Sequence, residues 1–365
     1  MKKVGIITIY DNSNFGNRLQ NYATQEVVKK IGLEPETLKN LRRCNVKSEK
    51  IFEKIKIDLI FIMKIVQNKI RKTKKEKVFE NFNKKYINLN KKYITANNAK
   101  YFEKKYDYFL VGSDQVWNPK FKRMTYVDLL GFTTGNKKIS FAASFGISDL
   151  NNDEKQKLKS YISDFKLLSV RENEGKDIIK NVLDKKEVEV LLDPTMLLDT
   201  NEWDNISKKP RNFTSKKYIL LYFLGEIQPE WKEKIQEIAK ENDCDIINVL
   251  DKNSEFYNIG PDEFIYLEKN AFLVCTDSFH STVFAILYER NFTVFERITK
   301  KTNMNSRVNT LLKKFELESN KFNGKIVMNI SEQKFRNVKD ILKKEREKSI
   351  NYLYRAFGED LRSEK

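Results

Sequence analysis

Short apolar runs alternate with helical patterns along this chain, and the alternation occurs in two successive sets. Each run is continuous and is bounded by polar residues or glycine, which is typical of strands buried on both faces of a parallel sheet. The first run, residues 4–9, leads through a polar turn into a helical pattern that ends at Gly32. The later runs of the first set are residues 108–111, 139–143, 167–170 and 188–192. The runs of the second set are residues 218–224, 246–249, 271–275 and 292–295.

This pattern predicts an α/β fold with two Rossmann-like, doubly wound domains that face each other across a cleft. A polar stretch at about residues 199–216 separates the two sets. We therefore expect an N-terminal domain over residues 1–200, a C-terminal domain over residues 215–335 and a C-terminal helix over residues 336–365. Ligands of doubly wound sheets bind at the carboxyl ends of the strands, so side chains that directly follow the runs are the candidates for a site.

The chain is strongly basic. It has 69 Lys and Arg against 51 Asp and Glu, a formal net charge of +18. Such a balance favours anionic partners, namely nucleic acid, an acidic membrane surface or phosphorylated substrates. No known nucleic-acid-binding motif appears, and +10 of the excess lies in residues 42–86 alone. A nucleic-acid-binding protein is therefore our third hypothesis, and we expect no nucleic acid among the partners.

Residues 42–86 predict a basic, amphipathic helical insertion in the N-terminal domain. Such a helix can lie on an anionic membrane surface, which would suit an enzyme that acts on lipid-linked glycans. The alternative is that its apolar face packs against the first domain. The apolar positions at helical spacing are Ile51, Ile55, Leu59, Ile62, Val66 and Ile70.

Cysteine and histidine are too scarce for several classes of site. Three scattered cysteines without a CxxC spacing argue against a disulfide framework and against a cysteine-based zinc site. His280 is the one histidine of the sequence. The start of the chain lacks the pattern of a signal peptide, and no window approaches a membrane-spanning length of about 18 apolar residues. We expect a cytoplasmic protein, peripheral at the inner face of the membrane if the insertion binds there, with no metal and no cofactor.

The strongest local signal is the stretch of residues 273–286, where an apolar strand enters a hydroxyl-rich turn and then a helix. Asp277 or Ser278 is a natural N-cap, followed by His280, Ser281 and Thr282. The N-terminus of a helix favours a phosphate or carboxylate, and imidazole can transfer a proton near neutral pH. We expect anion binding with proton transfer by His280. The alternative is a capping turn with a hydrogen-bonded structural histidine.

A second signal follows the run at residues 108–111. Gly112 permits a sharp turn, after which a loop carries hydroxyl, carboxylate, amide and indole groups, a combination that suits a sugar. The alternative is an Asx-turn with a buried tryptophan. The candidate acceptor-binding residues of this loop are Ser113, Asp114, Gln115, Trp117 and Asn118.

Weaker candidates come from three other places. The loop at residues 11–18 contains Asn14 and Asn17 but neither a dinucleotide fingerprint nor a P-loop. Arg171 follows a buried run and could clamp a carboxylate or phosphate, and a salt bridge with Glu172 or a neighbour is the alternative. Arg297 and Arg307 are further candidates of the same kind.

In this order, these pieces resemble the polysaccharide pyruvyl transferase family, over about residues 4–315. The matching stretches are Asn14-Phe-Gly-Asn17, Val111-Gly-Ser-Asp-Gln-Val-Trp117, Ala142-Ala-Ser-Phe-Gly146, Ser169-Val-Arg-Glu172, Leu192-Asp-Pro-Thr195 and Thr276-Asp-Ser-Phe-His-Ser-Thr282.

The resemblance implies a fold like that of B-type glycosyltransferases, with the acceptor on the N-terminal side and the donor on the C-terminal side. It also implies transfer of pyruvate from phosphoenolpyruvate, as a ketal, onto a sugar of a bacterial surface or capsular polysaccharide or of its lipid-linked precursor. It links His280 and Arg171 to the donor. The chain departs from the family pattern at Asn17, Ser278 and Ser281, where other members carry Asp, Arg and Gly.

On this basis we assign His280 as acid or phosphate partner and Asp114 as the group that orients or deprotonates the acceptor hydroxyl. Arg171 is assigned as the donor clamp, with Ser278, Ser281, Thr282, Arg297 and Arg307 as further donor-binding residues. Asn14 and Asn17 join the acceptor side. The runner-up is a glycosyltransferase of the same architecture that uses a nucleotide sugar.

Overall fold

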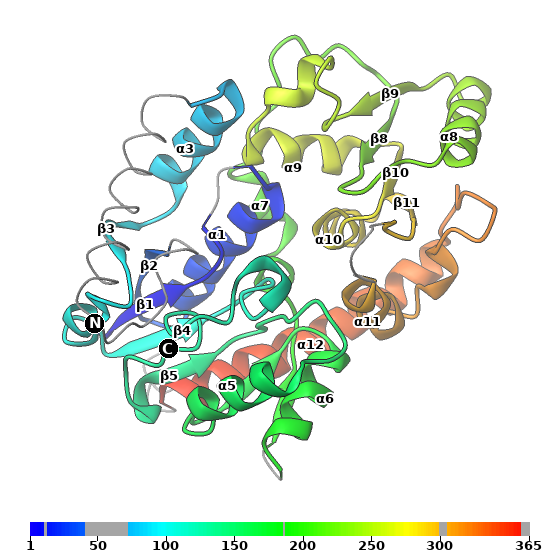
Figure 1. Cartoon of the computed structure of the whole chain (residues 1–365). Coiled ribbons are helices and arrows are strands. Elements are labelled where there is room, and N and C mark those ends of the chain that lie inside the picture. Colours follow the sequence, from blue (N-terminus) through cyan, green and yellow to red (C-terminus); the bar gives the residue numbers. More distant parts are fainter. Residues whose placement is uncertain (11–12, 41–71, 185–186, 299–304, 359–365) are drawn as a thin grey trace. The chain divides into compact units, whose positions relative to one another are not determined.

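The computed structural model describes the chain except for residues 11–12, 41–71, 185–186, 299–304 and 359–365 (Figure 1). The chain divides into two compact units. Unit 1 comprises Met1–Leu197 and Glu347–Lys365, and unit 2 comprises Leu198–Arg346. The long helix α12 (Glu332–Phe357) contributes its first part to unit 2 and its last part to unit 1. The apolar positions of the predicted insertion, Ile51 to Ile70, lie outside the described residues.

Unit 1 contains parallel strands that form in the predicted short runs and in two further segments, β2 and β3. The strands are β1 (Lys3–Ile7), β2 (Glu34–Asn40), β3 (Leu89–Ile94), β4 (Tyr108–Val111), β5 (Lys138–Ser140), β6 (Leu168–Val170) and β7 (Val188–Val190). Its helices are α1 (Phe15–Lys30), α3 (Lys74–Tyr86), α4 (Ala99–Glu103), α5 (Asn152–Ile162) and α6 (Asn173–Val182).

The described strands of unit 1 have the order β3-β2-β1-β4-β5, and every pair is parallel. The parallel β6-β7 pair continues this order, because isolated bridges join Ile139 to Leu167 and Ala143 to Val170. The order reverses between β1 and β4, which is the switch point where doubly wound sheets bind ligands. Side chains that follow β1 and β4 therefore meet at one edge of the sheet.

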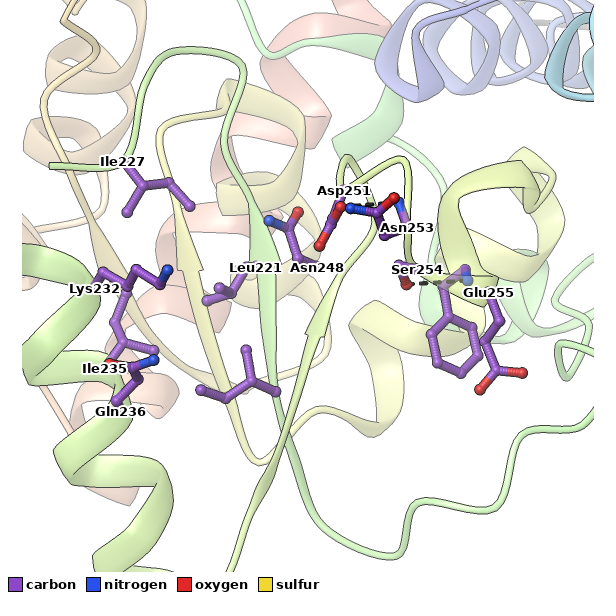
Figure 2. Close-up of a pocket in the computed structure, with 12 residues that line it drawn as sticks. Leu221, Ile227, Lys232, Ile235, Gln236, Asn248, Asp251, Asn253, Ser254 and Glu255 are labelled. Carbon is purple, nitrogen blue, oxygen red and sulfur yellow. Dashed lines mark hydrogen bonds between the residues drawn. The ribbon is translucent and has the colours of Figure 1, made fainter. Parts of the chain in front are cut away.

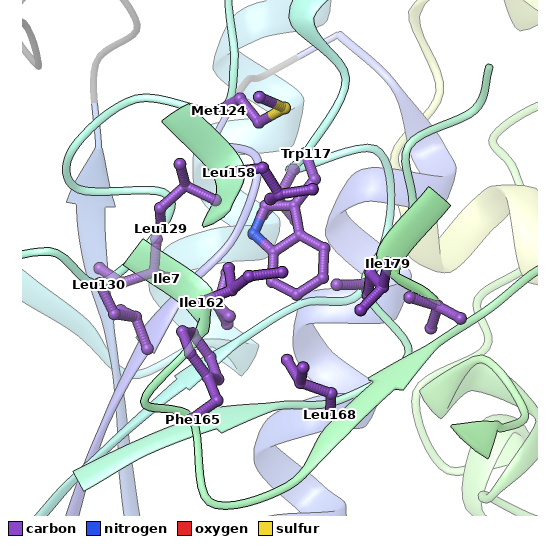
Figure 3. Close-up of a cluster of buried hydrophobic side chains, with 14 of the residues drawn as sticks. Ile7, Trp117, Met124, Leu129, Leu130, Leu158, Ile162, Phe165, Leu168 and Ile179 are labelled. Carbon is purple, nitrogen blue, oxygen red and sulfur yellow. The ribbon is translucent and has the colours of Figure 1, made fainter. Parts of the chain in front are cut away.

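A buried apolar cluster fills unit 1 around Trp117, whose ring is fully enclosed (Figure 3). The Trp117 ring packs against Phe145 and Phe165, with ring centroids 5.4 and 6.3 Å apart. Its Nε1 donates to the carbonyl oxygen of Asp128 at 3.1 Å. The indole is therefore a core residue with its polar atom satisfied, and burial of such a ring stabilises the fold by several kcal/mol, on the order of 3–5.

Helix ends in unit 1 follow local capping rules. Asn14 is the N-cap of α1, and its side chain accepts a hydrogen bond from the backbone N–H of Asn17. A capping box between Thr73 and Glu76 begins α3.

In the C-terminal part of α12, Tyr352 is fully buried and donates to the Ser140 carbonyl oxygen at 2.7 Å, which fixes that end of the helix to unit 1.

Unit 2 repeats the α/β plan with four described parallel strands in the order β11-β10-β8-β9. Here the order reverses between β8 and β10. The strands are β8 (Tyr218–Tyr222), β9 (Asp245–Asn248), β10 (Leu273–Thr276) and β11 (Asn291–Val294). The helices, apart from the start of α12, are α7 (Thr200–Asp204), α8 (Pro229–Glu241), α9 (Pro261–Asn270), α10 (Phe279–Leu287) and α11 (Ser306–Lys314).

Both units confirm the predicted α/β class with parallel, Rossmann-like sheets. Within the residues that the structure describes, none of the helices combines the length and the apolar character needed to span a membrane.

Candidate functional site

Asp114 lies at the switch point of unit 1, directly after β4, and is almost fully buried. Its Oδ1 accepts hydrogen bonds from the Gln115 backbone N–H at 2.8 Å and from Arg171 Nη2 at 3.2 Å. Its Oδ2 accepts from Nδ2 of Asn17, in the first turn of α1. Asp114 has a φ of +68°, a left-handed conformation that non-glycine residues rarely adopt and that is typical of functional sites.

Arg171 follows β6 and joins Asp114 to a second buried carboxylate, Asp193. Nη1 of Arg171 lies 2.6 Å from Asp193 Oδ2, which also accepts from Ser113 Oγ at 2.7 Å. Thr195 binds the other oxygen of Asp193 through its N–H and hydroxyl groups. Burial alone would lower the pKa of Arg171, but the charges of Asp193 and Asp114 outweigh it and raise that pKa. The guanidinium is therefore firmly charged.

Glu172 fixes the turn at residues 144–146 in the same region. One of its carboxylate oxygens accepts from the Ser144 hydroxyl at 2.9 Å and from the backbone N–H groups of Phe145 and Gly146 at 2.8 and 3.1 Å. Gly146 has a φ of +63°, and a Cβ there would lie 2.0 Å from Gln115 Oε1. Gly112 is equally constrained. Its φ is +126°, and a Cβ there would clash with the Phe141 carbonyl oxygen at 2.1 Å.

These contacts join five stretches that are far apart in the sequence, and we call them the motif network of unit 1. Its members are Asn17, Ser113, Asp114, Ser144, Arg171, Glu172, Asp193 and Thr195. Asp193 was not among the predicted site residues. Its position after β7 was the available signal, because side chains at the carboxyl ends of parallel strands converge.

The network changes two predicted roles. Arg171 was expected to clamp the donor, but its side chain is 1% exposed and is held by two carboxylates, so the salt-bridge alternative describes it. Asp114 was expected to orient or deprotonate a hydroxyl, but both of its carboxylate oxygens already accept hydrogen bonds within unit 1. Three carboxylates, Asp114, Asp193 and Glu172, surround one guanidinium here, which disfavours an anionic donor.

The other acceptor candidates of this loop are also internal. The prediction that Trp117 contacts the acceptor is wrong, because its ring is fully buried in the core. Ser113 is buried and bonded to Asp193, and Asn118 donates to Gln115 Oε1 at 2.7 Å. Gln115 is 7% exposed. Asn14 and Asn17 begin α1, as an N-cap and as a ligand of Asp114.

Unit 2 has its own aspartate at the switch point, Asp277, directly after β10. Its carboxylate accepts from the backbone N–H groups of Leu224 and Gly225, both at 2.7 Å, in the loop after β8. Arg297, which follows β11, approaches the same carboxylate with Nε at 3.2 Å and with Nη2 at 3.3 Å. Arg297 Nη2 also donates to the Asp277 carbonyl oxygen at 2.9 Å. Asp277 therefore holds Arg297 at the carboxyl edge of the sheet.

The N-terminus of α10 lies next to Asp277 in the chain. Ser278 occupies the predicted N-cap position, but its side chain makes no capping hydrogen bond. His280 is in the first turn of this helix and is 5% exposed, with its ring 5.3 Å from that of Phe279. The first turn carries no acidic side chain, which leaves the N-terminal turn of this helix favourable to an anion.

Ser281 and Thr282 were predicted to bind the donor, but their hydroxyl groups donate to other groups of unit 2. Ser281 is fully buried and donates to Glu268 Oε1 of α9 at 2.5 Å, and Thr282 donates to the Ser278 carbonyl oxygen at 2.9 Å. Burial raises the pKa of Glu268 well above its usual value, against the opposing effect of the Ser281 hydrogen bond, and so favours the neutral form of this carboxyl. Arg307, in the first turn of α11, is also buried. Ser281 and Thr282 therefore have hydrogen-bond partners within unit 2, whereas donor binding by Arg307 stays a prediction.

A pocket of about 720 Å³ opens between α8 and the loop after β9 (Figure 2). Leu221, Ile227 and Ile235 form part of its apolar surface, and Asn248 and Asp251 are among its polar groups (Figure 2). One lysine and two carboxylates line it, so its formal charge is negative. A trianionic donor would be repelled from this pocket.

Comparison with solved structures finds distant neighbours. The UDP-GlcNAc 2-epimerase of Methanocaldococcus jannaschii is 15% identical, with 93% of this chain and 99% of that chain covered and a TM-score of 0.41. The UDP-GlcNAc 2-epimerase of Neisseria meningitidis is 10% identical over 94% and 99%, with a TM-score of 0.45. The ADP-heptose LPS heptosyltransferase II of E. coli is 9% identical over 94% and 99%, with a TM-score of 0.35. These distant likenesses assign no activity to this chain.

Comparison with curated protein sequences finds no match. The family model of polysaccharide pyruvyl transferases, in contrast, matches residues 14–297, which is well over half of the chain. The matched range includes the motif network of unit 1, together with Asp277, His280 and Arg297 of unit 2. The resemblance of the motifs is thereby confirmed. The chain belongs to the polysaccharide pyruvyl transferase family.

Proposed function

We propose that this transferase moves pyruvate from phosphoenolpyruvate onto a sugar of a surface or capsular polysaccharide, or of its lipid-linked precursor, as a ketal. Family membership supports a pyruvyl transfer to a polysaccharide. The observation that carries the proposed donor is the placement of Arg297 and of the α10 N-terminus, with His280, at the carboxyl ends of the adjacent strands β10 and β11. A guanidinium and a helix N-terminus are the groups that proteins use to bind phosphate and carboxylate.

Arg297 is suited to a donor because Asp277 fixes it without enclosing it. The hydrogen bonds to Asp277 use its Nε and Nη2, and no partner of Nη1 is found in the described part of the chain. One face of the guanidinium is thus held while another nitrogen is available to an anion. Arg297 takes the donor-binding role that the sequence had suggested for Arg171.

The proposed reaction needs one proton donor and two sugar hydroxyls. A proton passes from His280 to the methylene carbon of phosphoenolpyruvate, which leaves an oxocarbenium-like centre at C2. The first hydroxyl adds to C2 and loses its proton, the C2–O bond to phosphate breaks, and phosphate leaves with a proton. The second hydroxyl then adds to C2 and loses its proton, which closes the ketal. Arg297 and the α10 N-terminus stabilise the charge on the departing phosphate.

In this proposal the motif network of unit 1 is a positioning device. Asp114, Asn17 and Arg171 fix the loops after β1, β4 and β6, from which the acceptor is expected to be bound. Peripheral contact of the basic segment at residues 42–86 with an anionic membrane belongs to the same proposal, since it would bring the enzyme to lipid-linked acceptors.

The test is acceptor-dependent release of phosphate from phosphoenolpyruvate, with mass spectrometry of the glycan product. We expect the product mass to rise by one pyruvyl unit. UDP-sugars are assayed in parallel. Transfer of a whole sugar from a UDP-sugar, without phosphate release from phosphoenolpyruvate, would replace this proposal with the glycosyltransferase alternative.

A further inference from the structure

Unit 1 contains a groove of about 740 Å³ that none of the roles above explains. Five lysines and one glutamate line it, together with two tyrosines. We call it the lysine–tyrosine groove, and the residues that matter most are Tyr10, Lys39, Lys84, Lys85, Tyr86 and Lys91. Its positive charge contrasts with the negative charge of the pocket beside α8 in unit 2.

The groove runs along α3 and the strands β2 and β3. Lys39 is on β2, Lys91 is on the neighbouring strand β3, and Lys84 and Tyr86 are on the last turns of α3. Tyr10 follows the carboxyl end of β1, whereas the last turn of a helix that connects parallel strands lies at their amino ends. The lining thus combines residues of α1, β2, α3 and β3, and its volume of about 740 Å³ has room for more than a single small anion.

The positive charge of the groove is only partly compensated. The one lining glutamate, Glu80, is already paired with Lys72 at 2.5 Å and with Lys84 at 3.6 Å. Among the residues that the structure describes, neither Lys39 nor Lys91 has a carboxylate within salt-bridge distance. Lys39 instead donates to the Lys91 carbonyl oxygen at 2.7 Å, and burial lowers its pKa. The Lys39 ammonium also lies 4.8 Å from the centroid of the Tyr93 ring, and an anion in the groove would add the opposite charge that these neighbours do not supply.

Aromatic rings accompany these cations. Lys85 Nζ lies 4.6 Å from the centroid of the Tyr86 ring, and the Tyr86 ring itself is partly exposed. At the other end, the Arg18 guanidinium lies 5.2 Å from the centroid of the Tyr10 ring. Arg18 is the chain neighbour of Asn17, which binds Asp114. Tyr10 and Tyr86 thus bring aromatic rings to the groove beside its ammonium groups, a combination that suits a saccharide with acidic substituents.

We infer that the lysine–tyrosine groove binds an acidic saccharide chain, one that carries carboxylate or phosphate groups, as an extended acceptor subsite. This deepens the proposed function, on which its description as an acceptor subsite rests, by naming the acceptor as an anionic glycan. Lysines bind the acidic groups, and Tyr10 and Tyr86 contact the sugar rings. Selectivity for sugars over other polyanions arises from the rings, because charge alone does not distinguish them.

The test measures binding by calorimetry with no phosphoenolpyruvate present, so that its outcome does not depend on the proposed reaction. The probes are a hexasaccharide of galacturonic acid and the neutral maltohexaose. The variant is Lys85→Gln with Lys91→Gln, two exposed positions of the groove. The matched control is Lys157→Gln with Lys159→Gln, two exposed lysines of α5 with the same change of charge.

We expect the galacturonate probe to bind the wild type and the control alike, to bind the groove variant about tenfold more weakly, and to outcompete maltohexaose. Equal weakening in the control would mean non-specific attraction and would overturn the inference, as would no binding by the wild type. Two further experiments measure the binding of single-stranded DNA and of phosphatidylglycerol vesicles to the same proteins. If the groove variant weakens the binding of either more than it weakens the binding of the galacturonate probe, the inference is also overturned.

Discussion

The two units place an aspartate and an arginine at their switch points in different ways. In unit 1, Asp114 and Asp193 enclose Arg171, whose side chain is 1% exposed. In unit 2, Asp277 holds Arg297 from one side, and the side chain of Arg297 is 7% exposed. The carboxylate of Asp277 is also bound by two backbone N–H groups, so it does not depend on the arginine alone.

This difference separates a structural ion pair from one that prepares a binding group. A guanidinium paired with two carboxylates and almost fully buried is out of reach of an external anion and stabilises the loops around it. A guanidinium held by one carboxylate, next to the N-terminus of α10, keeps capacity for an external anion. Similar sequence patterns, an arginine shortly after a buried strand, therefore lead to different roles.

The largest effect is expected for His280, which stands beside the pair in unit 2. We expect His280→Gln to lower turnover by about 10²–10⁴-fold, the usual contribution of a general acid, with an unchanged melting temperature. Steady-state kinetics and thermal unfolding of the same preparation measure both. A variant that loses melting temperature but keeps its specific activity would make His280 a structural residue and would leave unit 2 without a proton donor.

Removal of each arginine should affect stability unequally. Arg171→Leu leaves two buried carboxylates without their cation, so we expect the free energy of unfolding to fall by about 3–5 kcal/mol. Arg297→Leu should cost only about 1–2 kcal/mol, since Asp277 keeps its two backbone donors. Urea unfolding of the two variants gives the values. Equal losses would break the comparison between the units.

Exchange of arginine for lysine tests the binding role. We expect Arg297→Lys to raise the KM for phosphoenolpyruvate about tenfold while the KM for the acceptor stays within about twofold, because an ammonium cannot bind Asp277 and an anion with the same planar geometry. The control is Arg211→Lys, an exposed position of unit 2. If donor kinetics do not change, Arg297 serves only the fold, as Arg171 does.

The last prediction concerns Glu268, a buried carboxyl of unit 2 for which the described residues supply no salt bridge. Its folded-state pKa is raised above the usual 4.5, chiefly by burial. Its stabilising contribution is therefore full below the unfolded pKa and is lost as pH rises through the folded value. We expect Glu268→Gln to gain stability relative to the wild type from pH 4.5 upward, by at most about 1.4 kcal/mol per pH unit. Denaturant unfolding at several pH values measures the difference.

The control for Glu268 is Glu237→Gln, an exposed carboxyl of α8. A stability difference for Glu268→Gln that stays constant with pH would contradict a buried neutral carboxyl. Glu268 would then resemble the carboxylates of unit 1 that pair with Arg171, and the two units would no longer differ in this respect.

The sequence predicted most strands of both units, because a strand covered on both faces needs a continuous apolar run. It missed β2 and β3, whose segments Glu34–Asn40 and Leu89–Ile94 alternate with charged residues. β3 is at the edge of the sheet, where polar side chains are tolerated. The turn before α10 was predicted from local chemistry, and Ser278 does occupy the N-cap position, although its side chain makes no capping hydrogen bond.

Partners of the polar residues could not be predicted in the same way. Arg171 has Glu172 as its nearest carboxylate in the sequence, yet it pairs with Asp114 and Asp193, 57 and 22 positions away. Trp117 stands among polar residues, yet its ring belongs to the core. In both cases the sequence contains the side chains, and the path of the folded chain decides which of them are in contact.

The sequence by itself determined the α/β class, the family and the edge of each sheet where polar groups gather. These depend on periodicity and on residues adjacent in the chain, which short-range sterics and burial control. Tertiary structure alone decided that Arg171 is enclosed while Arg297 is held from one side, and that lysines of α1, β2, α3 and β3 line one groove. Such differences arise because parallel strands bring distant loops to one edge, where burial and charge pairing are set by contacts that no local pattern encodes.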